Sequence, residues 1–449
     1  MSELTREKMI ESIRAAGVVG AGGGGFPTHV KVDAKVELVI ANGAECEPLV
    51  RVDQQEMAER PGELLRGMQI VMAITGASEG VIGLKRKYTE AIARLEEQIR
   101  LKGLSSRIRL HPMDNYYPAG DEFVLVREVT GKVIPEFGLP LHVGVVVSNV
   151  ATLMDVAGAV DEGRPVTHRL VTVAGAVTAP GSFRVPVGTP LSSLVQAAGG
   201  ATVRSARLVL GGPMMGALVE DEEQPVTKTT SMIIVLSEKH PVVQRRMRDN
   251  LRQLHLTRSA CLKCMMCTEV CPRNLLGHRL YPDRLMRSLA ADVTEDLEAY
   301  RGATLCSECG LCSVYGCVMN LDPAYMNREM KKKLAAAGVE RPAPVEQAER
   351  VFAATRKVPT QRLVARLGLS DYDREAPVRA FDVKLTRLRI PLKQHAGAPA
   401  RAVVRPGQVV AAGDLLGEIP DDALGARVHT GLAGTVSEVN DDSITMELG

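Results

Sequence analysis

The residues of this chain with the clearest chemistry are its cysteines. There are nine; Cys46 stands alone, and the other eight form two groups between Cys261 and Cys317. Because the cytosol keeps thiols reduced, a dense set of cysteines in a chain without a secretion signal indicates metal ligands rather than disulfides. We therefore expect both groups to hold metal.

The spacing within each group predicts iron–sulfur clusters. Residues 261–272 read C-x2-C-x2-C-x3-C-P. Three thiolates with this spacing can surround one face of a cubane, and a fourth that precedes proline points toward a second cluster. Residues 306–317 read C-x2-C-x2-C-x4-C, so the last spacing is one residue longer and no proline follows.

Crossed ligation divides the eight cysteines into two [4Fe–4S] sites. One expected site is Cys261, Cys264, Cys267 and Cys317, and the other is Cys306, Cys309, Cys312 and Cys271. The alternatives are structural zinc, whose sites usually pair C-x2-C hairpins across a long gap, and a degenerate second site with one labile cluster. Two clusters in one chain indicate electron transfer, so the protein also needs a site that takes electrons from a two-electron donor and an acceptor that receives them.

A tract of glycines at residues 20–25 is the next candidate site. It formally satisfies G-x-G-x-x-G, but a Rossmann loop follows a strand and opens a helix, whereas this tract follows a predicted helix. We therefore reject the Rossmann interpretation. Consecutive glycines cost backbone entropy, so close approach of the backbone to a phosphate or a flat ring is the expected reason. Lys31 can supply charge to a phosphate there, and a solvated lysine is the alternative.

The whole chain is long enough for several domains to position these residues. It has 449 residues, which suggests about three domains. Its formal net charge of +2 argues against nucleic acid or an anionic membrane surface as the main partner. No apolar run approaches the ~18 residues that span a bilayer. The N-terminus has no apolar signal region, so we expect a cytoplasmic protein.

Changes of pattern along the chain predict a multidomain fold, α/β and α+β. Residues 1–165 alternate apolar strands with helical stretches, which indicates an α/β domain. Residues 166–238 resemble a small β-grasp module of the soluble-ligand-binding (SLBB) type. Residues 239–343 are expected to form a helical, ferredoxin-like domain with the two clusters, and residues 344–375 a helical linker. Residues 376–449 read as strands between Gly and Pro turns and resemble a barrel-sandwich hybrid.

Four motifs carry a resemblance to known flavoproteins: GAGGGGFPTHVK (20–31), NGAECEP (42–48), YPAGDEF (117–123) and SNVATL (148–153). They resemble the flavin-binding fold of the NADH-oxidising subunit of respiratory complex I, and more closely the RnfC component of the Rnf electron-transport complex. RnfC proteins carry the barrel-sandwich domain at the N-terminus. The C-terminal position here is similar to the PduS-type cobalamin reductases of bacterial microcompartments.

The resemblance implies an FMN-binding α/β domain. The residues implied to bind FMN are Gly22, Gly24, Gly25, Lys31, Asn42, Glu45, Asn149 and Thr152. The loop implied to cover flavin and nicotinamide contains Tyr117, Gly120, Asp121 and Glu122. The relatives carry two adjacent glutamates in this loop, and here the first is Asp121. Exposed loop acids are the alternative for Glu45 and Glu47, and Cys46 is expected to be a small loop residue rather than a redox thiol.

The function implied by the resemblance is an NADH-dependent reductase. Electrons would pass from NADH through FMN and two [4Fe–4S] clusters to cobalamin, taking cob(III)alamin to cob(II)alamin and cob(I)alamin. No catalytic side chain is expected, because hydride transfer is the chemistry of the flavin. The implied partners are NADH, cobalamin, and microcompartment shell or cobalamin adenosyltransferase proteins, within a cytoplasmic microcompartment. The alternatives are a peripheral RnfC-like component of a membrane complex and a non-catalytic docking protein.

Overall fold

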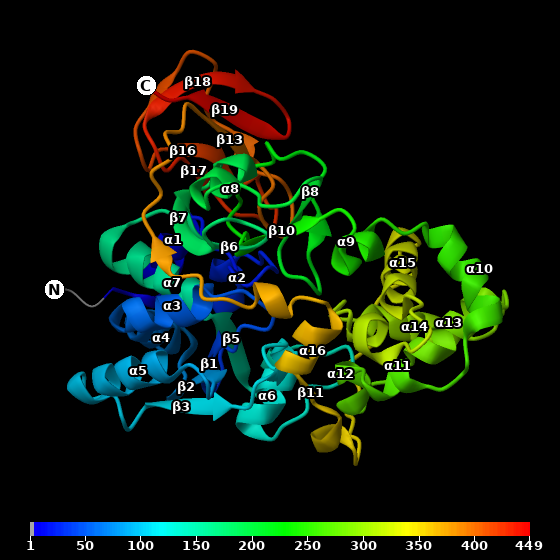
Figure 1. Cartoon of the computed structure of the whole chain (residues 1–449). Helices are drawn as coiled ribbons and strands as arrows, with labels where there is room; N and C mark the ends of the chain where they lie inside the picture. The colour runs from blue at the N-terminus through cyan, green and yellow to red at the C-terminus, as the bar shows by residue number, and fades with distance from the viewer. Residues whose placement is uncertain (1–3) are drawn as a thin grey trace.

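The computed structural model describes residues 4–449, apart from the side chains of residues 250 and 251. Figure 1 shows the helices of the cysteine region as a lobe at the side of the other domains, with the C-terminal strands at the opposite end of the molecule. None of the helices described is both long and apolar enough to cross a membrane. The predicted multidomain fold is confirmed, and its parts differ in architecture.

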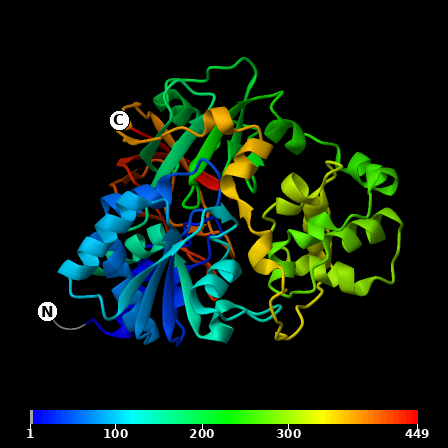
Figure 2. The same cartoon turned by 60° about the horizontal axis from the view of Figure 1, so that its bottom comes forward.

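The N-terminal part is an α/β domain around a parallel sheet. The strand order is β3 (Ile108–Met113), β2 (Glu79–Lys85), β1 (Leu38–Gly43), β5 (Val145–Asn149). Its other elements are α1 (Arg6–Ala15), α2 (Thr28–Val32), α3 (Val52–Glu59), α4 (Pro61–Thr75), α5 (Thr89–Leu101), β4 (Tyr116–Tyr117), α6 (Glu122–Thr130), η1 (Pro140–Val143) and α7 (Val150–Glu162). Figure 2 shows the sheet with helices on either side.

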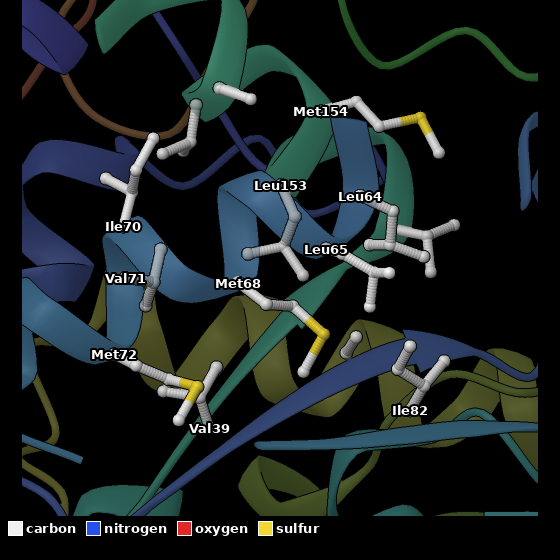
Figure 3. Close-up of a cluster of buried hydrophobic side chains, with 14 of the residues drawn as sticks. Val39, Leu64, Leu65, Met68, Ile70, Val71, Met72, Ile82, Leu153 and Met154 are labelled. Atoms are coloured by element: carbon white, nitrogen blue, oxygen red, sulfur yellow. The ribbon is translucent and has the colours of Figure 1, made fainter. Parts of the chain in front are cut away.

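Alternate residues of the central strand reach different hydrophobic cores. Val39 and Ala41 belong to the core under α4 and α7, whereas Ile40 belongs to the core under α6. A strand buried on both faces needs an almost continuous apolar sequence, which explains the run at residues 38–41. Figure 3 shows side chains of the first core, including Met68 from α4 and Leu153 from α7.

The β-grasp module is a mixed sheet next to the α/β domain. Its strand order is β12 (Val378–Arg379), β7 (Gly181–Pro186), β6 (His168–Gly175), β10 (Met232–Ser237), β8 (Ala206–Leu210), β9 (Ala217–Leu218). One helix, α8 (Leu191–Ala197), packs on it through Leu191 and Leu194. The short strands around one helix agree with the sequence pattern.

The cysteine region is helical. Its elements are α9 (Pro241–Arg246), α10 (Asn250–Ala260), α11 (Met266–Glu269), α12 (Pro272–Leu275), α13 (Pro282–Ala290), α14 (Leu297–Gly302), η2 (Ala303–Leu305), η3 (Cys312–Gly316) and α15 (Pro323–Ala336). Most are short; Cys267 lies in α11 and Cys312 in η3, and the other six cysteines of the two groups lie outside the helices. α9 begins at a His240 cap and connects this lobe to the β-grasp module.

The segment expected as a helical linker, residues 344–375, is mostly not helical. It contains η4 (Ala353–Arg356), β11 (Val358–Pro359), α16 (Thr360–Arg366) and η5 (Ser370–Tyr372). Pro359 prevents the helix from extending toward the N-terminus, and β11 instead pairs with β4 of the α/β domain. β12 also differs from expectation, because it lies within residues 376–449 but joins the β-grasp sheet.

The C-terminal strands form two small sheets with a common core. One sheet has the order β13 (Arg387–Pro391), β19 (Ser443–Glu447), β18 (Gly434–Val439), β15 (Val409–Val410). The other has the order β14 (Arg401–Ala402), β16 (Leu415–Glu418), β17 (Val428–His429). Leu388, Leu416 and Ile444 are fully buried between them. The arrangement is that of the expected barrel-sandwich domain.

Candidate functional site

A cavity of about 890 Å³ lies between the α/β domain and the β-grasp module. β1 is the point where the sheet order reverses, because β2 lies on one side of it and β5 on the other. Ligands of open α/β sheets bind at the carboxyl ends of the strands at such a point. Asn42 of β1 and Asn149 of β5 are register neighbours there, and both line the cavity.

Seven of the twelve residues predicted for the flavin site line this cavity. They are Gly22, Asn42, Glu45, Tyr117, Gly120, Asp121 and Asn149. An eighth, Thr152, supports the wall, because its hydroxyl accepts a hydrogen bond from the Ala21 amide at 2.9 Å. Gly24, Gly25, Lys31 and Glu122 are not among the lining residues. The volume is within the usual range for a cofactor site.

The glycine tract is shaped by close backbone contacts. Gly25 has φ +58°, and a Cβ there would lie 3.1 Å from the His395 backbone. Its carbonyl accepts a hydrogen bond from the Ala396 amide, so the barrel domain holds this end of the tract. A Cβ on Gly22 would lie 3.5 Å from Asn149, on the cavity side. The small residues therefore keep the wall thin where a flat ring or a phosphate could approach.

Lys31 and Glu122 form an ion pair with each other. Lys31 Nζ lies 3.1 Å from Glu122 Oε1, and both side chains are about one-third exposed. This pair joins α2 to the first turn of α6. In this structure the lysine expected at a phosphate is held by a carboxylate at the edge of the site.

Glu45 lies in the cavity wall and is 8% exposed, which excludes the alternative of an exposed loop acid. Its Oε1 accepts a hydrogen bond from the Asp53 amide at 3.1 Å. Asn149 Nδ2 donates to Asp53 Oδ2 at 2.9 Å. Burial raises the pKa of Glu45 to about 7, and burial together with Glu45 raises the pKa of Asp53. Glu45 can therefore carry a proton near neutral pH beside the cavity.

Glu47 connects the same loop to the β-grasp module. Its carboxylate accepts hydrogen bonds from the amides of Met214 and Met215, each at 2.9 Å. Burial raises the pKa of Glu47 to about 7. Between the two acids, Cys46 Sγ accepts a hydrogen bond from the Gly120 amide at 2.7 Å, and burial raises the pKa of this thiol to about 12. Glu47 thus ties this loop to the β-grasp module, and Cys46 ties it to the loop at residues 117–123.

Four cysteines line a second, small cavity: Cys271, Cys306, Cys309 and Cys312. They are the set that crossed ligation assigns to one cluster. Burial raises the pKa of the Cys271 thiol to about 12, and the nearby Cys306 acts in the same direction. Cluster iron would hold these groups as thiolates, so the residues present suit a [4Fe–4S] cluster. Within residues 4–449, no three His, Cys, Asp or Glu side chains converge closely enough to ligate a single metal ion.

Three cysteines of the other expected site, Cys261, Cys267 and Cys317, lie together at another place in the lobe. Cys261 and Cys317 pack against the same apolar cluster around Leu321. Burial raises the pKa of the Cys267 thiol to about 12, and Cys317 and Cys261 are close enough to act in the same direction. Cys264 is exposed. The structure thus brings Cys317 to the first group despite its longer spacing.

The sequence did not reveal the β-grasp wall of the large cavity. Arg169 and Arg184 line it, and each pairs with an acid of the α/β domain, Asp155 at 2.8 Å and Glu56 at 2.9 Å. They belong to no motif, and Arg184 lies far along the chain from Glu56. Their one signal is the presence of arginines in strands that are otherwise apolar.

Comparison with known proteins identifies the domains. Residues 13–158 match the Nuo51 FMN-binding domain, 170–218 the SLBB domain, 260–322 the 4Fe-4S dicluster domain and 370–447 the RnfC barrel sandwich hybrid domain. The chain is 42% identical to "Cobalamin reductase PduS" of Salmonella typhimurium, over 99% of this chain and 98% of that protein. The chain belongs to the PduS family. The protein of the same name from Citrobacter freundii is also 42% identical, over 98% of this chain and 96% of its own length.

Relatives outside the PduS family share only part of the chain. The RnfC-type component of the Na(+)-translocating ferredoxin:NAD(+) oxidoreductase complex of Acetobacterium woodii is 32% identical over 61% of this chain and 60% of its own. Among solved structures, an NAD+-reducing [NiFe]-hydrogenase in the air-oxidized state has a TM-score of 0.51 at 20% identity, covering 82% of this chain and 66% of that one, which shows a shared fold. This PduS family member is an oxidoreductase with FMN and 4Fe–4S clusters as cofactors.

Proposed function

We propose that this chain is an NADH-dependent cobalamin reductase. Its two PduS relatives carry the name cobalamin reductase and match it over nearly the whole length. The observation that carries the proposal is the contact between the two cavities: Cys309 lines both the large cavity and the small cysteine cavity. A flavin in the first and a cluster in the second would be direct neighbours.

Bound FMN would accept a hydride, which carries two electrons, and pass the electrons on one at a time. The chain's own residues hold and surround it. Asn42 Nδ2 donates a hydrogen bond to the Gly120 carbonyl at 2.9 Å, which ties the loop at residues 117–123 to the strand below it. Burial raises the pKa of Glu45 at the same wall to about 7. Tyr117 lines the cavity together with Cys309 of the cysteine lobe, and its side chain is 1% exposed.

NADH is the proposed electron donor, and a cytoplasmic microcompartment with shell or adenosyltransferase partners is the proposed setting. Support for the donor comes from relatives such as the Acetobacterium woodii protein, whose complex is named a ferredoxin:NAD(+) oxidoreductase. Arg169 and Arg184 line the β-grasp side of the cavity. The setting rests on the likeness to the PduS proteins.

The proposal is tested with anaerobically purified protein, washed free of unbound flavin. We expect FMN rather than FAD on denaturation, labile sulfide with about eight iron atoms, and NADH-driven reduction of cob(III)alamin. Free flavin is omitted because reduced flavin can itself reduce cob(III)alamin. A Cys46→Ser variant serves as a cysteine control with full iron content. Protein with all cofactors that reduces a ferredoxin but not cobalamin would favour the Rnf-like role instead.

A further inference from the structure

We propose that the two cysteine sets are arranged in series behind the flavin cavity. The inner set is Cys271, Cys306, Cys309 and Cys312, and the outer set is Cys261, Cys264, Cys267 and Cys317. Electrons enter the cysteine lobe at the inner set and leave the protein at the outer set. This inference rests on the function proposed above and adds the direction of transfer and the exit face.

The inner set shares a wall with the flavin cavity. Ser307 and Cys309 line the large cavity and the small cysteine cavity alike. None of the four outer cysteines is among the residues that line the large cavity. Because electron transfer becomes slower with distance, a reduced flavin in the large cavity would reach the inner set first.

Two buried contacts join the flavin loop to the inner set. The Tyr117 hydroxyl donates a hydrogen bond to the Cys309 carbonyl at 2.7 Å. Asp121, in the same loop, pairs with Arg273 at 3.0 Å, and both side chains are at most 10% exposed. Arg273 follows Cys271 by two residues and lines the small cysteine cavity. The loop that faces the flavin therefore also supports the inner cluster.

The inner and outer sets are joined by tightly packed backbone. Cys267 lies in α11, Cys312 lies in η3, and these two elements are in direct contact. A Cβ on Gly316 would lie 3.0 Å from Cys267 Cα, so glycine permits this close approach. A cluster held by the outer set would thus lie next to one held by the inner set.

The outer set contains Cys264, which is the exposed cysteine of the two sets. Cys264 is exposed, and it is flanked by Leu262, which is 63% exposed, and Met265, which is 49% exposed. Val318 and Met319, next to Cys317, are 54% and 42% exposed. These exposed apolar side chains lie next to cysteines of the outer set in the sequence, where an electron acceptor could approach a cluster without crossing the protein.

Electrons and protons balance in the proposed reaction. One NADH gives NAD+, one proton and two electrons, and the proton is released to solvent. Clusters held by the inner and outer cysteine sets would each accept one electron at a time and pass it on, so neither cluster is changed at the end. Two cob(III)alamin molecules each gain one electron and become cob(II)alamin.

The order is tested with one variant for each set, Cys306→Ser for the inner and Cys264→Ser for the outer. Iron, sulfide and FMN are measured first, and rapid freeze-quench EPR then follows the remaining cluster after NADH is added. In Cys264→Ser, we expect the inner cluster to be reduced as fast as in the wild type. In Cys306→Ser, the flavin should bleach normally, while the outer cluster is reduced at least tenfold more slowly although dithionite reduces it fully. Equal rates for the outer cluster in Cys306→Ser and the wild type would overturn the order.

Light-driven reduction of the bound flavin, with EDTA as donor, separates this inference from the proposed function. If NADH fails to reduce the wild-type flavin, the donor assignment is wrong, and photoreduction still reveals which cluster is reduced first.

A second pair of variants applies if either serine variant loses all its iron. Tyr117→Phe removes the hydroxyl bonded to Cys309, and Tyr325→Phe removes the hydroxyl of a residue that packs on the same apolar cluster as Cys261 and Cys317. In potentiometric EPR titrations, Tyr117→Phe should shift the midpoint potential of one cluster only, the inner one, and Tyr325→Phe should leave that cluster unchanged. If Tyr117→Phe changes the midpoint potential of neither cluster, the proposed link between the flavin loop and the inner cluster is wrong.

Discussion

The Asp121 side chain, at the edge of the flavin cavity, caps a helix and also pairs with an arginine. Its Oδ1 accepts hydrogen bonds from the amides of Phe123 and Val124 and so caps α6. The same carboxylate pairs with Arg273, whose guanidinium also stacks on the Phe123 ring. The motif placed Asp121 in the loop over the flavin, but the sequence could not show this partner, because Arg273 comes from the cysteine lobe.

We expect Asp121→Asn to destabilise the protein by about 3 kcal/mol, because it keeps a cap acceptor but leaves the buried Arg273 without a counter-charge. Asp114→Asn is the matched control, since its carboxylate is 81% exposed and should change stability little. Urea unfolding followed by circular dichroism, with iron content measured alongside, gives the comparison. Equal midpoints for the two variants would show that the buried pair contributes nothing.

Helices and strands were predictable where each has its own apolar pattern. The strands and helices of residues 1–165 agree with their sequence patterns, because each one buries a face against a neighbour within the same domain. Residues 344–375 were not predictable in this way: they cross from the cysteine lobe to the α/β domain, and β11 takes its backbone partners from β4. The β-grasp wall of the cavity was missed for the same reason, since its partners lie in another domain.

The contact between α4 and α7 depends on one small residue. A Cβ added to Gly67 would lie 1.8 Å from the Leu153 carbonyl oxygen, so the two helices cannot keep their distance with any larger residue. We expect Gly67→Ala to destabilise the protein by about 3 kcal/mol or more and to lower the FMN content, because α7 begins at the Asn149 cap in the cavity wall.

Gly62→Ala is the control for this prediction. It lies at the start of the same helix, where an added Cβ meets no atom closer than 3.9 Å. Thermal unfolding and flavin fluorescence of both variants decide the outcome. If Gly67→Ala is as stable as Gly62→Ala, the packing distance between α4 and α7 is not limiting.

At the scale of the whole molecule, Lys228 joins three domains. It belongs to the β-grasp module, and its Nζ donates hydrogen bonds to the Gly17 carbonyl at 2.7 Å and the Arg427 carbonyl at 2.6 Å. Burial lowers the pKa of Lys228 to about 7, and Arg169 acts in the same direction while Asp155 opposes it. Burial and Lys228 lower the pKa of the adjacent His429 to about 3, so this histidine stays neutral.

This arrangement predicts a dependence of stability on pH. Between the folded pKa of about 7 and the ordinary value of 10.5, the unfolded chain binds a proton at Lys228 that the folded chain does not. The free energy of unfolding contributed by this group should therefore rise with pH, by up to about 1.4 kcal/mol per pH unit.

Relative to Lys228→Met, the wild type should gain stability from about pH 7.5 to about pH 9 in urea unfolding. Lys239→Met, at an exposed position, should parallel the wild type, and a constant difference for Lys228→Met would contradict the prediction.

The C-terminal barrel is attached to the beginning of the chain by non-covalent contacts. The Ala396 amide donates a hydrogen bond to the Gly25 carbonyl. Lys228 Nζ donates hydrogen bonds to the carbonyls of both Arg427 and Gly17. A domain held in place by such contacts keeps its position in space whichever end of the polypeptide carries it. Gene rearrangement could therefore move the barrel between the two ends during evolution without redesigning the surface on which it sits.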